Sequence, residues 1–177
     1  MNDKQIYAGL ITVIDEGLKA NAINNVCVLR GYQPLPQGRL SKPSITLIKL
    51  FDRRIGHPHK SNIYDKDNDV FEHQEITLLE STFQISAFLT ENPADEAGLT
   101  ASDLCNTVAR ILSHDDALVA LAKIGLRPVN FSPLRQNQFE NEKGVYELNP
   151  SFDLVLTHQF VTKTVIPAAQ TLEGKFA

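Results

Sequence analysis

The sequence predicts an α+β fold: a mostly antiparallel sheet of about five strands, covered by two main helices, with a long projecting hairpin. Two observations carry this prediction. Several short segments alternate apolar and polar residues with the period of two that is typical of half-buried strands, and two others repeat apolar residues at helical spacing. Their order along the chain is helix, strands, helix, strands, which favours helices packed on one face of an antiparallel sheet.

The first predicted helix covers residues 4–20, with Asn2 or Asp3 as its N-cap. Its apolar residues recur at helical spacing and are Ile6, Leu10, Val13, Ile14 and Leu18. The second main helix begins after the capping pair Thr100 and Asp103. Its apolar stripe consists of Leu104, Val108, Ile111 and Leu112. A further helical piece is predicted at residues 115–123, ended by Gly125.

The clearest strand signal lies in residues 75–89, where one face carries Phe83, Ile85, Ala87 and Leu89. Alternation also predicts strands at residues 44–51 and 151–162. Two shorter strands are predicted at residues 26–29 and 126–131, and Pro128 indicates that the latter lies at an edge or contains a bulge.

Proline and polar residues predict the connections of a single domain spanning residues 1–177. Residues 32–43 hold three prolines and a glycine, which favours an ordered loop or contact arm. The polar stretch at residues 55–71 predicts a hairpin tip that projects from the body, since loops of this length are often functional. Residues 133–144 are predicted to form a loop, and residues 167–177 a C-terminal arm.

Composition narrows the function classes. The chain has 177 residues, 42% of them hydrophobic, and a formal charge of −4 with its Lys and Arg residues scattered, which argues against a basic surface that clamps nucleic acid. Cys27 and Cys105 show no disulfide or metal spacing, so we expect both to be reduced thiols. The absence of a signal-like or bilayer-length apolar run favours a soluble protein made in a cytoplasm.

One cluster has metal-ligand chemistry: His57, His59 and His73 with Asp65, Asp67 and Asp69. The aspartates copy the opening of a calcium loop, but its sixth position is Val70 instead of glycine and its twelfth is Ile76 instead of glutamate. A solvated hairpin tip explains the cluster as well, and we expect neither a metal nor another cofactor.

Catalytic signatures are also missing. Ser132 and Ser151 lie in no nucleophile elbow, the glycines are dispersed, and both cysteines lie in apolar patterns. His158 alternates with Leu156 and Phe160, which favours a hydrogen-bonded core or interface histidine over a general base. We therefore expect no catalytic residues and no enzymatic activity.

Charged residues on the predicted hairpin favour a contact surface instead. Arg53 and Arg54 precede the polar stretch and three aspartates lie within it, which would suit head-to-tail pairing between copies. Ordinary solvated charge at strand ends is the alternative. The candidate interface residues are Arg39, Arg53, Arg54, His57, His59, Tyr64, Asp65, Asp67 and Asp69.

Four stretches carry a resemblance to a known family: YQPLPQGRLSKPSITLIKL, STFQISAFL followed by a helix, KIGLRPVNF and FDLVLTHQF. In order and spacing, over roughly residues 1–165, the chain resembles the phage neck and tail terminator proteins. These are small α+β subunits that close the end of a bacteriophage tail.

The resemblance implies a non-enzymatic virion protein that forms a ring, usually sixfold, stops polymerisation of the tail tube and offers a docking surface to the head connector. Its implied partners are further copies of itself, the tail tube protein and head-connector or neck proteins, with genomic DNA passing through unbound and no membrane involved. The implied location is the virion neck, after assembly in the host cytoplasm. By position, the hairpin would comprise residues 54–71, and residues 32–43 would form a second contact arm.

Two other functions remain open. The chain could be a monomeric or dimeric adaptor of the tail or neck, or a metal-dependent hydrolase that uses His57, His59 and the aspartates. The ring hypothesis predicts that deleting residues 56–68 leaves a folded monomer that no longer assembles. Rings that persist without these residues would show that the hairpin is not the contact.

Overall fold

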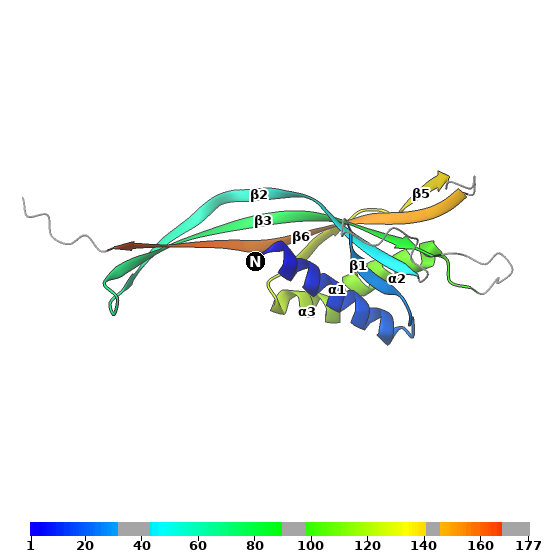
Figure 1. Ribbon diagram of the computed structural model, residues 1–177, viewed down its shortest axis with the longest axis horizontal. Coiled ribbons are helices and arrows are strands. Elements are labelled where there is room, and N and C mark those ends of the chain that lie inside the picture. Colours follow the sequence, from blue (N-terminus) through cyan, green and yellow to red (C-terminus); the bar gives the residue numbers. More distant parts are fainter. Residues whose placement is uncertain (32–42, 90–97, 141–145, 168–177) are drawn as a thin grey trace, which may run out of the picture.

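The computed structural model describes residues 1–31, 43–89, 98–140 and 146–167 of the chain. These form one sheet with helices on one side (Figure 1). The helices are α1 (Asp3–Ala20), α2 (Ala101–Ser113) and α3 (Asp115–Lys123). The strands are β1 (Cys27–Arg30), β2 (Ser44–Asp65), β3 (Val70–Phe88), β4 (Arg127–Phe131), β5 (Arg135–Glu140) and β6 (Tyr146–Pro167).

Three long strands form the centre of the sheet, whose order is β1-β2-β3-β6-β4, with β5 also paired to β6. All these pairs are antiparallel except β1 with β2. Strand β3 lies between β2 and β6, and its residues 70–86, apart from Thr77, have a register partner on both sides. The predicted α+β class with a mostly antiparallel sheet is confirmed.

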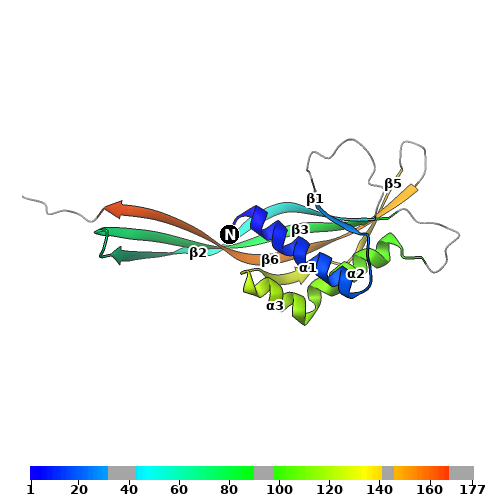
Figure 2. The same cartoon turned by 60° about the horizontal axis from the view of Figure 1, so that its bottom comes forward.

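The helices cover only one end of the sheet (Figures 1 and 2). Both main helices begin with a capping box: Asn2 pairs with Gln5 at α1, and Thr100 with Asp103 at α2. The predicted apolar stripes of both helices are buried, and they pack on the alternating residues of the sheet that face them. The largest fully buried side chains in this core include Phe83 on β3 and Phe152 on β6. We call this end of the molecule the body.

Beyond the body, β2, β3 and β6 continue together as a three-stranded ribbon with no helix beside it (Figure 1). We call this ribbon, residues 54–65, 70–79 and 158–167, the blade. Along β3, burial changes from fully buried at Phe83 to exposed at Phe71. At the usual rise of a strand, β3 from Leu79 to Val70 makes the blade about 30 Å long. The predicted projecting hairpin is therefore present, and a third strand accompanies it.

Three boundaries differ from the sequence predictions. Residues 133–144 were expected to be a loop, but β5 occupies Arg135–Glu140 because its backbone pairs with β6 in a hairpin register. The polar stretch at residues 55–71 is strand apart from its turn, since each of β2 and β3 satisfies the backbone of the other. Strand β6 reaches Pro167 instead of Thr162 for the same reason, because it pairs with β3 up to that residue.

Several other predictions can be placed. Strand β4 lies at an edge, with a register shift between Pro128 and Asn130, as its proline indicates. Residues 32–42, most of the predicted contact arm, lie outside the described residues, as do residues 168–177 of the predicted C-terminal arm. No helix among the described residues is long and apolar enough to cross a membrane. The limits of the predicted single domain remain a prediction.

We expect Phe83→Ala to lower the free energy of unfolding by about 3–5 kcal/mol, because it leaves a large cavity in the core. The control is Phe51→Ala, at a residue of β2 that is 56% exposed, and its change should stay within about 0.5 kcal/mol. Urea unfolding followed by circular dichroism gives both values. Equal losses of stability in the two variants would contradict the placement of Phe83 in the buried core and of Phe51 at the surface.

Candidate functional site: the blade

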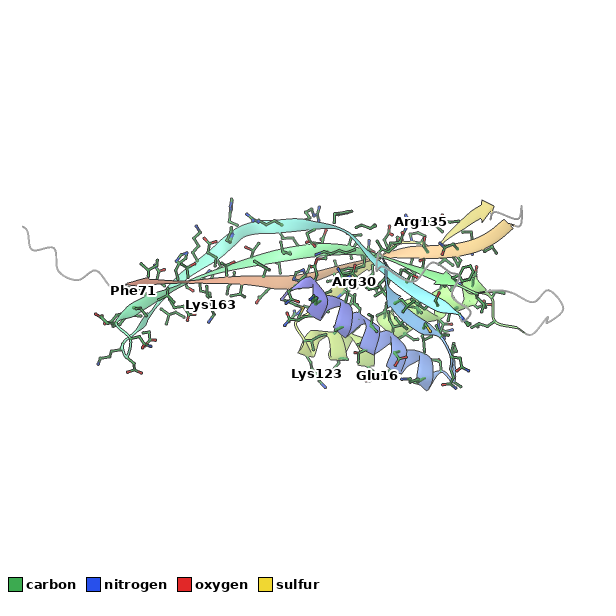
Figure 3. All side chains as sticks on the ribbon, viewed as in Figure 1. Glu16, Arg30, Phe71, Lys123, Arg135 and Lys163 are labelled. Carbon is green, nitrogen blue, oxygen red and sulfur yellow. The ribbon has the colours of Figure 1, made fainter. Side chains whose placement is uncertain are left out.

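An apolar row crosses all three strands near the end of the blade. Tyr64 on β2 is the register partner of Phe71 on β3, which in turn is the partner of Ile166 on β6. Their exposed fractions are 49%, 39% and 46%, and the rings of Tyr64 and Phe71 lie 5.0 Å apart between centroids. Figure 3 shows Phe71 far from the helices that carry Glu16 and Lys123. A row of this kind normally faces a core or a partner.

The opposite face of the blade carries a second apolar set, because neighbouring residues of a strand point to opposite faces. Ile63 and Val165 flank Glu72 in the next cross-strand row and are 55% and 63% exposed. Glu72 is bonded to Lys163, with 2.6 Å between Nζ and Oε1. Both faces of the blade therefore present apolar side chains to solvent near its end.

The tight turn between β2 and β3 uses the aspartates that were candidate metal ligands. Asp65 accepts hydrogen bonds from the side chain of Asn68 and from the backbone N–H groups of Asp67 and Asn68, and these bonds lower the pKa of Asp65. Tyr64 donates to Oδ1 of Asp69 at 2.7 Å, which raises the pKa of Tyr64. Among the described residues, no group of three or more ligands could hold a metal ion. The carboxylates of Asp65 and Asp69 stabilise the turn.

The two long edges of the blade differ. Within the described residues, β1 pairs with β2 only up to Leu47, and β4 pairs with β6 only up to Thr157. The β2 edge and the β6 edge of the blade therefore have no partner strand among the described residues. The β2 edge is interrupted by a bulge between Ile55 and His59, where Gly56 has φ +68° and Pro58 has no N–H to donate. The register of β6 is unbroken from Ser151 to Pro167.

A polar cluster lies where the blade meets the body. Lys49 contacts Asp3 and Asp52 at 2.7 and 2.6 Å. Ser81 donates its hydroxyl proton to Asp52 at 2.5 Å, and Nε2 of His158 lies 2.9 Å from the same hydroxyl oxygen. Because the hydroxyl proton is engaged with Asp52, Nε2 must donate to Ser81. Hence this imidazole does not act as a base toward the serine in this arrangement, and the cluster ties β2, β3, β6 and α1 together.

Burial and pairing set the charges in this cluster. Desolvation lowers the pKa of His158, against the opposing effect of Asp52. Burial alone would raise the pKa of Asp52, but hydrogen bonds from Lys49 and Ser81 outweigh it and lower that pKa. The Nδ1 atom of His158 is buried and has no hydrogen-bond partner among the described residues. The structure therefore favours a neutral His158 beside an ionised Asp52.

All but one of the predicted interface residues lie on the blade or just before it. Arg53 pairs with Glu80 at 2.8 Å, Arg54 is exposed at the start of the blade, and His57 is part of the bulge. His59, Tyr64, Asp65, Asp67 and Asp69 lie farther out, and Arg39 lies outside the described residues. The arginines and the aspartates are thus at opposite ends of the blade, and their role in contacts between copies stays a prediction.

The sequence analysis missed the apolar residues of the blade, namely Phe71, Val165 and Ile166. A signal for the last two exists, because residues 160–166 are mostly β-branched and so favour a strand. It also missed the link from Asp52 through Ser81 to His158, which joins three strands distant in sequence.

We expect the stability of the protein to fall as the pH drops from about 7.5 to about 5.5. The lowered pKa of His158 means that the unfolded chain takes up a proton near its ordinary value of about 6.5 while the folded chain does not, so stability is lost below that pH, at most about 1.4 kcal/mol per pH unit. Asp52, with a lowered pKa, contributes only near and below its ordinary value of 3.8.

Urea midpoints measured across this pH range test the assignment. His158→Gln, which retains a donor toward Ser81, should flatten the profile between pH 5.5 and 7.5. His57→Gln, at an exposed position, should leave it unchanged. An unaltered slope in the His158 variant would mean that another group controls the dependence.

Comparison with known proteins adds the family. None of the curated proteins matches the sequence. A solved structure described as the sheath/tube terminator of an extracellular contractile injection system (PVC) in its extended state has a TM-score of 0.56 at 11% identity. It matches 100% of this chain, which spans 63% of that chain's length. A chain from the virion of a native gene transfer agent particle gives a TM-score of 0.21 at 15% identity, covering 84% and 92% of the two chains, and carries no argument.

The terminator structure shows a shared fold. The profile of a protein family, described as the E217 gateway protein gp29, matches residues 5–168 and so nearly the whole chain. This confirms the expected relationship to the phage neck and tail terminator proteins. The chain belongs to the E217 gateway protein gp29 family.

Proposed function

We propose that this protein is a structural, non-enzymatic subunit of a ring in the phage neck, which caps the tail tube and offers a surface to the head connector. The observation that carries the proposal is the blade. It has exposed apolar residues on both faces and two edges without a strand partner in the described residues. Family membership supports the same role.

The blade is costly for a protein that acts alone. Open edges of long strands invite pairing with other chains, and proteins that work as monomers usually protect them. Apolar rows such as Tyr64, Phe71 and Ile166 also gain stability when a partner covers them. Head-to-tail contacts that close into a ring satisfy every such surface, whereas contacts that fail to close would build a filament.

The proposed partners are further copies of this chain in a sixfold ring, the tail tube protein and head-connector or neck proteins. The terminator structure that shares the fold supports an association with tail proteins. The formal charge of −4 suits a ring through which DNA passes without being held. We propose the neck of the virion as its location, after assembly in the host cytoplasm and with no cofactor.

A monomeric or dimeric adaptor of the tail or neck is the second candidate, and one observation favours it. A groove of about 610 Å³ lies between the three helices, on the body and away from the blade. Its apolar lining includes Val13, Ile23, Ile111 and Ala120. A segment of another protein bound there would use the body instead of the blade.

Removal of the blade separates these functions. Deleting residues 56–68 alone would leave β3 without its partner over residues 70–76, so the deletion must match across the strands. Ile55 and Leu78 are register partners, and an Asn-Gly turn can join them once residues 56–77 are removed. Ending this chain after Gln159, the neighbour of Leu78 on β6, completes the design.

We expect the shortened chain to keep the urea stability of its body but to remain monomeric by light scattering, whereas the full chain forms rings, alone or on tail tubes. The matched control is Ala120→Arg, which fills the groove and leaves the blade intact. Rings that survive loss of the blade would overturn the proposal. A full chain that stays monomeric or dimeric even on tail tubes, and that loses its binding to tail or neck proteins in the Ala120 variant, would favour the adaptor.

A further inference from the structure

We propose that neighbouring copies join edge to edge: residues 161–167 of β6 in one copy pair, in parallel, with residues 59–65 of β2 in a second copy. The blades then form one continuous sheet around the ring. This inference rests on the proposed ring function and names the contact between neighbouring copies that builds the ring. We call this contact the joint.

The two edge segments match in length and direction. On β2, the stretch between the bulge that ends at His59 and the turn after Asp65 is regular, and these seven residues have a register partner on β3. On β6, residues 161–167 lie level with this stretch, because both segments pair with residues 70–76 of β3. Strands β2 and β6 run parallel to each other, so rotation about an axis along the blade places β6 of one copy parallel to β2 of the next.

The side chains favour an in-step register, in which residues of β6 and β2 that share one partner on β3 face each other across the joint. Ile166 and Tyr64 share a cross-strand row within one copy, so the two residues also become neighbours across the joint. Val165 and Ile63 become neighbours on the opposite face in the same way. The apolar row of each blade therefore continues into the next, and cross-strand apolar pairs of this kind stabilise a sheet.

Charges do not oppose the joint. Lys163 is the only charged residue in residues 161–167, and in this register it lies beside Ser61 of the second copy. Lys60 lies beside Thr162, and Asp65 lies beside Pro167. No like charges meet directly across the two strands, an arrangement that would be destabilising.

The bulge restricts where β2 can pair. Gly56, His57 and Pro58 stand opposite Thr77 alone, which bends the strand and leaves Pro58 without an N–H. Bulges and prolines are devices that protect an edge, and here they protect the inner part of the β2 edge only. Residues 59–65 of β2, beyond the bulge, and the whole of the β6 edge keep a regular register with β3. The joint therefore belongs at the part of the blade beyond the bulge.

Cysteine cross-linking tests the joint directly. Asn62 and Thr164 both pair with His73, on opposite sides of β3. Within one chain their Cα atoms are therefore two strand spacings apart, about 10 Å, which is too far for a disulfide, whereas across the proposed joint they are about 5 Å apart. Any Asn62→Cys to Thr164→Cys bond is thus between chains.

The native cysteines do not interfere with this cross-linking experiment. Cys105 is buried, and burial raises the pKa of its thiol to about 12, so it does not react. Cys27 is replaced by serine in all variants. Full-length Asn62→Cys protein is mixed with full-length Thr164→Cys protein and oxidised mildly, and the products are separated by mass. The matched control replaces the first partner with Val119→Cys, an exposed position on α3.

We expect the Asn62–Thr164 heterodimer to form about tenfold faster than the control product, because the joint holds the two thiols at a high effective concentration. A chain that carries both cysteines should give a ladder that stops at the ring size. Cross-linking captures weak contacts, so absence of the heterodimer at the highest soluble concentration overturns the inference. Fast homodimers of Thr164→Cys alone would also overturn it, since they indicate antiparallel pairing of two β6 edges.

Electron microscopy of the same samples separates this inference from the proposed function. Rings without the specific cross-link would retain the function and reject the joint. A ladder that continues without limit into filaments would retain the joint and reject ring closure.

Discussion

The structure depends on the pairing of β3 with β2 on one side and β6 on the other over residues 70–86. A two-stranded hairpin is marginal in water, but a third strand adds a second ladder and gives the central backbone a partner on both sides. This is why the blade can extend about 30 Å from the body with no helix beside it. Hydrogen bonding between strands, rather than a core, holds it together.

The same alternation has opposite consequences at the two ends of these strands. In the body, Phe83 and Phe152 meet helices α1 and α2 and form the core, which supplies the stability of the fold. In the blade, Phe71 and Ile166 meet no helix among the described residues and stay partly exposed, available for a partner. The cluster of Lys49, Asp52, Ser81 and His158 lies at the boundary, where partial burial still allows charge pairs.

Sequence patterns predicted the parts of the fold that local chemistry controls. The buried face of residues 83–87, the N-caps of both main helices and the edge or bulge in β4 all follow from residues near one another in the chain. Strand β5 was missed because its polar residues are held by pairing with β6, which no local pattern reports. The charged part of the candidate site was predicted, because it belongs to the long polar stretch at residues 55–71. Its apolar part was not, because alternation looks the same whether a row faces a core or solvent.

Ring closure explains how modest joints could suffice. An edge pairing of seven residues covers only a few side chains, each adding about 1.5–3 kcal/mol when fully buried, and much of that gain is offset by lost translational and rotational freedom. In a ring, every copy makes two joints, and the last copy forms its second joint without a further loss of freedom. Exposed rows that are too small to build a stable dimer can therefore build a stable ring. For the proposed ring, we therefore expect assembly only when enough copies, or a tail tube to template them, are present.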